Sequence, residues 1–71
     1  RDSILTNREI EVVGLMAEGL TSRSIARKLE ISHETVKVHR RRILKKAQVT
    51  SSIELIRKAI HYRWIYGSMA A

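Results

Sequence analysis

One segment, Ser32–Ala47, constrains the fold of this chain most, because it reads as a long helix with two unlike faces. At 100° per residue, Val36, Ile43 and Ala47 fall on one side, which suits a hydrophobic core. Six of the ten residues from Lys37 to Lys46 are basic, and all but one of them fall on the opposite face or its flank. Such a helix must pack along one side of a domain and leave its other side exposed.

Length and composition place this helix in a single all-helical domain. Seventy-one residues make one domain at most. Proline is absent, only three glycines occur, and the apolar spacing is helical, which favours an all-α fold. Cysteine is also absent, which excludes a disulfide framework and thiolate metal sites. No apolar run approaches the roughly 18 residues of a membrane span. We therefore expect a cytoplasmic protein with no membrane partner, cut from a longer chain because it begins without methionine.

Capping signals divide the chain into four predicted helices. Thr6 and Glu9 form a capping box that opens the first helix, and Ser51 with Glu54 forms another that opens the fourth. The predicted helices span about residues 7–18, 22–29, 33–47 and 52–66. We expect a linker or N-terminal extension over 1–5, the domain over 6–66 and a frayed C-terminus over 67–71. A three-residue turn, 30–32, joins the second and third helices, so the fold is a four-helix, bundle-like domain containing a helix-turn-helix.

The positive charge is concentrated in the middle of the chain. Residues 1–22 carry a net charge of −2, residues 23–46 carry +7 and residues 47–71 carry +2. A polyanion such as nucleic acid is the partner that this distribution favours. The alternative is a charged face that is only solvated.

The exposed face of the third helix predicts the residues that touch DNA bases. Val38 points roughly 200° away from Val36, and a valine among cations could contact a thymine methyl group. Lys37 and Arg41 lie four residues apart on the same face and could donate to guanine O6 and N7. The alternatives are a valine exposed by chance and two cations that touch only phosphate.

A second group of polar residues should contact the DNA backbone, which orients the protein without reading sequence. The residues that we expect to contact phosphates from the third helix and the start of the second are Ser22, Thr35, Arg42, Lys45 and Lys46. Arg40 falls near the edge of the core face, so we expect its stem to lie on apolar surface with its head in water.

The chain resembles the LuxR/FixJ (GerE-like) helix-turn-helix family of bacterial transcription regulators. The matching residues are Leu5–Glu9, Gly19–Ala26, Ile31–Ser32, Thr35–His39 and Ile43–Lys46. The resemblance implies four helices, with the third in the major groove and the fourth in dimer contacts. It also implies base contacts from Lys37, Val38 and Arg41, and positions near phosphates for Thr35, His39 and Lys46.

Two residues depart from the family pattern at positions where glycine is frequent. Glu30 lies in the turn of the helix-turn-helix, and a positive φ there would cost it about 1 kcal/mol. Arg63 replaces a glycine that closes the fourth helix in many members, which suggests a longer fourth helix here.

The fourth predicted helix is apolar over too wide an arc for a monomer. Its two stripes span roughly 200°, whereas a surface helix needs about 100°. We assign Leu55 and Ala59 to the core, and Ile53, Ile56 and Ile60 to a homodimer interface. The alternatives are that the whole arc packs inside the domain or against a missing upstream domain. A two-fold dimer would read paired half-sites.

Other classes of function fit the sequence less well. No catalytic grouping or phosphate-binding loop is present, and we expect neither enzyme activity nor a cofactor. His33 and His39 lie six residues apart, on different sides of one helix, so they cannot share a metal. The alternative function is a basic interaction module that binds an acidic protein partner or RNA polymerase. Such a module would not need an exposed Val38.

Overall fold

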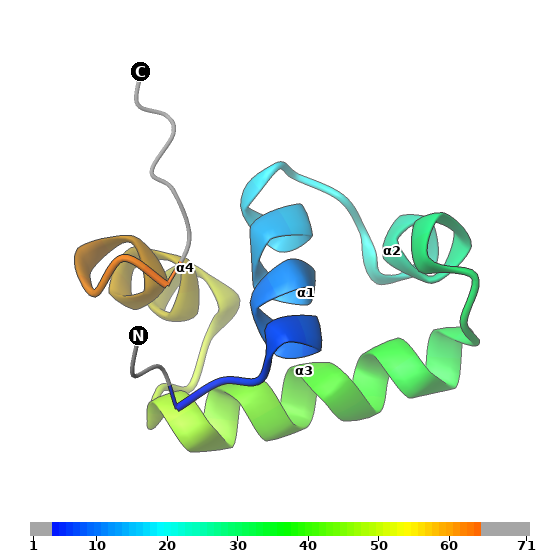
Figure 1. Ribbon diagram of the computed structural model, residues 1–71. Helices are drawn as coiled ribbons and strands as arrows, with labels where there is room; N and C mark the ends of the chain where they lie inside the picture. Colours follow the sequence, from blue (N-terminus) through cyan, green and yellow to red (C-terminus); the bar gives the residue numbers. More distant parts are fainter. Residues whose placement is uncertain (1–3, 65–71) are drawn as a thin grey trace.

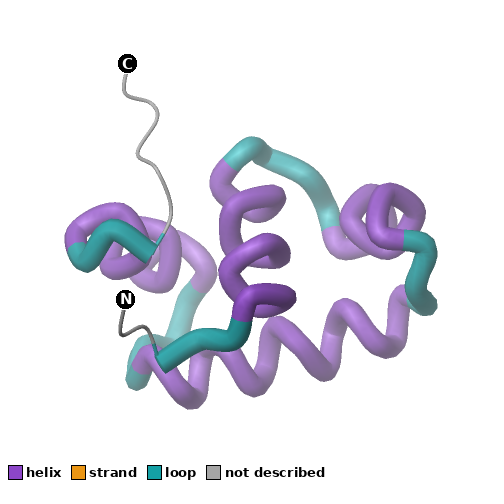
Figure 2. The backbone as a smooth tube through the Cα atoms, in the orientation of Figure 1, coloured by secondary structure: helices purple, strands orange, loops and turns teal. Residues whose placement is uncertain are grey.

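The computed structural model describes residues 4–64 and contains four helices, with no strand in that range. Their bounds are α1 Asn7–Ala17, α2 Ser22–Leu29, α3 His33–Ala47 and α4 Ser52–His61. Short loops join them (Figure 2). The all-α prediction is confirmed, and the bounds of the first three helices agree with the predicted ones to within one residue.

The longest helix, α3, forms one side of the domain. Figure 1 shows α1 standing across α3, with α2 and α4 on opposite sides of α1. Helix α2 packs most extensively on α3, as the two helices of a helix-turn-helix do. Within the described residues, no helix is long and apolar enough to cross a membrane.

The predicted core face of α3 is buried. Val36, Ile43 and Ala47 are at most 1% exposed, so the helix is oriented as its sequence pattern indicates. The other fully buried side chains come from all three remaining helices and comprise Val12, Val13, Ile25, Leu55 and Ala59. This core fixes which side of α3 faces outward.

Each helix begins at a hydroxyl N-cap, although one predicted capping box is incomplete. Thr6 and Glu9 form the expected reciprocal pair at α1. At α4, Ser51 Oγ accepts from the Glu54 N–H, but the Glu54 carboxylate accepts from the N–H and the hydroxyl of Thr50 instead of from Ser51. These bonds, that from the Thr50 N–H foremost, lower the pKa of Glu54.

Each helix also ends in the same way, in a left-handed residue followed by an apolar one. The left-handed residues are Gly19, Glu30, Gln48 and Arg63, with φ between 59° and 94°. The apolar residues that follow are Leu20, Ile31, Val49 and Trp64, and all four pack against the core. The N–H of each bonds back to a carbonyl five residues earlier, which is the Schellman motif. Glu30 does take the positive φ whose cost was considered above, at 59°.

The predicted end of the fourth helix, near residue 66, is wrong. Helix α4 ends at His61, since Arg63 takes φ 61° and the Trp64 N–H donates to Ala59 O at 2.8 Å. Arg63 thus takes the conformation that glycine favours rather than extending the helix. Gly67, the residue type favoured just after a helix that ends at 66, lies outside the described residues.

Candidate nucleic-acid interface

The three side chains predicted to contact bases all lie on the exposed side of α3. Lys37, Val38 and Arg41 are exposed, and Val38 keeps 36% of its surface accessible. None of them is covered by the rest of the described domain. The arrangement offers one apolar side chain between two long cationic ones on a protruding helix face.

Lys37 has a partner on its own helix. Its ammonium lies 3.3 Å from a carboxylate oxygen of Glu34, and both side chains are exposed. An exposed pair at this spacing contributes only about 0.2–0.5 kcal/mol, so a base or phosphate can replace the carboxylate at little cost.

The residues predicted to contact phosphates differ in whether they already bind other residues of the domain. Arg42 and Lys45 are exposed and form no ion pair with the acidic residues described. The Thr35 hydroxyl lies 2.8 Å from that of Ser32, which caps α3. Ser22 and Lys46 are hydrogen-bonded within the domain, and each connects to a residue whose role sequence reasoning missed.

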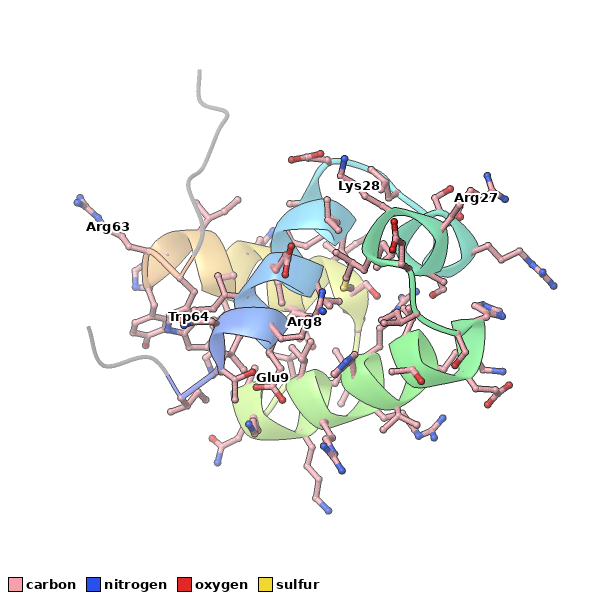
Figure 3. All side chains as sticks on the ribbon, turned by 45° about the vertical axis from the view of Figure 1, so that its right-hand side comes forward. Arg8, Glu9, Arg27, Lys28, Arg63 and Trp64 are labelled. Atoms are coloured by element: carbon pink, nitrogen blue, oxygen red, sulfur yellow. The ribbon has the colours of Figure 1, made fainter. Side chains whose placement is uncertain are left out.

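Lys46 joins the end of α3 to the start of α1. Its ammonium lies 2.8 Å from Oε1 of Glu9, a residue that is only 4% exposed. Burial alone would raise the pKa of Glu9, but hydrogen bonds from Lys46 and Thr6 outweigh it, so that this pKa is lowered. Figure 3 shows Glu9 on the side of α1 that faces α3. The ammonium has three donors, so this pair leaves others for a phosphate.

Arg40 does not place its head in water, and that prediction is wrong. Its guanidinium donates to Ser22 Oγ at 2.5 Å and to Ser52 Oγ at 2.8 Å. The two hydroxyls belong to the first residues of α2 and α4. Because these acceptors come from other helices, the sequence pattern of α3 alone does not predict them.

His39 is half-buried, and its Nδ1 is buried with no hydrogen-bond partner. This ring edge faces inward, toward the domain. The described residues contain no group of three or more side chains that could hold a metal ion, so His39 is not part of such a group.

The residues assigned to a dimer interface are exposed to different degrees. Ile53 is 69% exposed and Ile60 41%, whereas Ile56 is half-buried and packs against the core. Leu55 and Ala59 are fully buried, as assigned. The outer side of α4 therefore carries two large apolar side chains that the described domain does not cover.

Comparisons with a protein-family model and with individual proteins all point to bacterial regulators. A family model described as bacterial regulatory proteins of the luxR family matches residues 3–59. The response regulatory protein YgeK of Escherichia coli K12 is 49% identical over 59 residues, which make up 83% of this chain and 40% of that protein. The nitrate/nitrite response regulator protein NarP of the same strain is 47% identical over 51 residues, 72% of this chain and 24% of that protein.

A solved structure shows the same arrangement of helices. The response regulator ChrA of a heme-sensing two-component system superposes with a TM-score of 0.84 at 37% identity, covering 92% of this chain and 32% of that one. The chain thus spans less than half the length of these relatives.

Proposed function

We propose that this chain, which belongs to the luxR family of bacterial regulatory proteins, binds double-stranded DNA sequence-specifically by placing α3 in the major groove. The family consists of transcription regulators and not of enzymes, and its relatives here are response regulators. The single observation that carries the proposal is the exposed side of α3, where Lys37, Val38 and Arg41 stand clear of the domain.

The dimensions and chemistry of this face suit a groove. An α-helix with its side chains is about 10–12 Å across, which matches the width of the major groove, about 12 Å. In this arrangement Arg41 and Lys37 donate to guanine, and Val38 contacts a thymine methyl. The backbone contacts that we propose come from Ser22, Thr35, His39, Arg42, Lys45 and Lys46.

The outer side of α4 supports a homodimer on paired half-sites. Ile53 and Ile60 are exposed and Ile56 lies between them, half-buried. Two copies joined there would present two α3 helices to DNA, one for each half-site. Binding to DNA would place the protein in the bacterial cytoplasm.

The experiment that tests the function is selection of bound sites from random duplexes, followed by Arg41→Ala. If Arg41 reads a base, the variant loses about 5- to 150-fold in affinity for the selected site, which corresponds to one good contact of 1–3 kcal/mol. Non-specific binding should stay nearly unchanged, because phosphate contacts remain. Arg27→Ala, on the outer side of α2 (Figure 3), is the matched control and should bind as the wild type does.

An equal loss on all duplexes would show that Arg41 contacts only phosphate. Failure to select any preferred sequence would contradict the proposal and favour the alternative, a basic module for an acidic protein or RNA polymerase.

A further inference from the structure

The Arg40 side chain links two helices, α2 and α4, whose backbones do not approach each other. Within residues 4–64, no residue of α2 has its Cα within 8 Å of the Cα of a residue of α4. From α3, the guanidinium nevertheless donates to Ser22 in the first turn of α2 and to Ser52 in the first turn of α4. All three side chains are half-buried, so water competes for these bonds less than it would at an exposed site.

We infer that Arg40 is a positioning residue that couples α4, the dimer helix, to the start of α2, which faces the DNA backbone. The inference rests on the proposed function. Because Ser22 and the first N–H groups of α2 meet phosphate, the angle at which α2 begins sets the register of α3 in the groove. The same side chain holds the start of α4, directly before Ile53. A change at one end of this bridge therefore reaches the other.

The chemistry of this position favours a guanidinium over an ammonium. A planar fork with fixed donors can serve two acceptors in different directions, whereas a lysine ammonium is a compact charge on a flexible stem. A cation also lies unfavourably at the positive N-terminal ends of two helices. The two hydroxyl acceptors, rather than the helix dipoles, therefore account for its location.

The test uses affinity for the selected site at several salt concentrations, with thermal unfolding measured on the same proteins. We expect Ser52→Ala and Arg40→Lys each to lower affinity about three- to tenfold without changing the salt slope. In an Arg40→Met background, Ser52→Ala should have no further effect, because the bridge is already gone. Arg27→Lys is the matched control and should leave affinity unchanged. Unfolding midpoints well above the assay temperature exclude simple loss of folded protein.

Two results would overturn the inference. If Arg40→Lys keeps wild-type affinity while Arg40→Met lowers the salt slope by about one, Arg40 contacts phosphate directly. If Ser52→Ala costs as much in the Arg40→Met background as in the wild type, the two residues are not coupled.

Failure of the wild type to bind any selected duplex would instead contradict the proposed function. The bridge would then be tested by the double-mutant cycle of Ser22→Ala and Ser52→Ala in unfolding. Coupling between the two serines would support the bridge, and additive effects would overturn it.

Discussion

Glu9 is a buried carboxylate whose ionisation links the stability of the domain to pH. Its lowered pKa means that the folded protein holds this proton less tightly than the unfolded chain, in which glutamate titrates near 4.5. The stabilisation from Glu9 is therefore complete above about pH 4.5 and is lost as the pH falls through the lower pKa of the folded state. The ion pair with Lys46 thus fixes the end of α3 to α1 throughout the neutral range.

We predict that Glu9→Gln destabilises the domain by about 2 kcal/mol at pH 7, because it removes a charge-assisted hydrogen bond to Lys46. The difference in unfolding free energy from the wild type should shrink as the pH falls from about 4.5 through the lower pKa of the folded state, because Glu9 is protonated first in the unfolded chain and then in the folded one. Urea unfolding at pH 3 to 7 measures this. The control is Glu11→Gln, whose carboxylate forms only an exposed pair with Arg8 on the same helix. A destabilisation that is the same at every pH would contradict the role assigned to the charge.

At the scale of the helix, starts and ends differ in how plainly the sequence marks them. Hydroxyl N-caps are local signals, since a side chain bonds an N–H three residues on, and each predicted start directly follows such a residue. Only Gly19 has the residue type expected at a helix end. At the other three ends a left-handed residue with a side chain is held in place by the apolar residue after it, which packs on the core. At α4, the helix whose end was predicted wrongly, the apolar Trp64 after Arg63 is the signal that would have found the end.

In the candidate site, too, some features can be predicted from the sequence and others cannot. Periodicity alone predicted which side of α3 is exposed, because the buried ridge determines the opposite face. The partners of Arg40 and Lys46 lie 12, 18 and 37 residues away along the chain. Such pairs form only once the helices have packed, so a helical wheel cannot assign them. For this reason two cations assigned to water or phosphate proved to be bonded within the domain.

We predict that Glu30→Gly stabilises the domain. Glu30 has φ 59°, which costs a residue with a Cβ about 1–2 kcal/mol, and glycine relieves that cost at the expense of a more flexible unfolded chain. The expected net gain is about 0.5–1 kcal/mol, seen as a rise of a few degrees in the thermal midpoint. Glu30→Ala is the control, because it removes the charge but keeps the Cβ. If alanine stabilises as much as glycine, charge rather than backbone conformation is the cause.

At the scale of the whole molecule, one copy of the domain is small compared with a DNA site that consists of two half-sites. Its principal extents are 29 × 26 × 22 Å, and one α3 spans a single half-site. The exposed side of α4 is about 15 Å long, too short to bury alone the roughly 1,000 Å² of a stable interface. We therefore expect the isolated domains to associate weakly in solution and to dimerise on DNA, where two half-sites hold them together.

We predict that Ile53→Glu abolishes cooperative binding to a duplex with two half-sites and leaves affinity for a single half-site unchanged. In a two-fold interface the substitution is present on both copies, so that two charges replace apolar contact. Ile53 is the better position than Ile56, because Ile56 also packs against the core and its replacement would disturb folding. Titration of duplexes carrying one or two half-sites measures the effect, with Ile4→Glu, an exposed isoleucine outside α4, as control. Cooperativity that survives Ile53→Glu would exclude this side of α4 as the dimer interface.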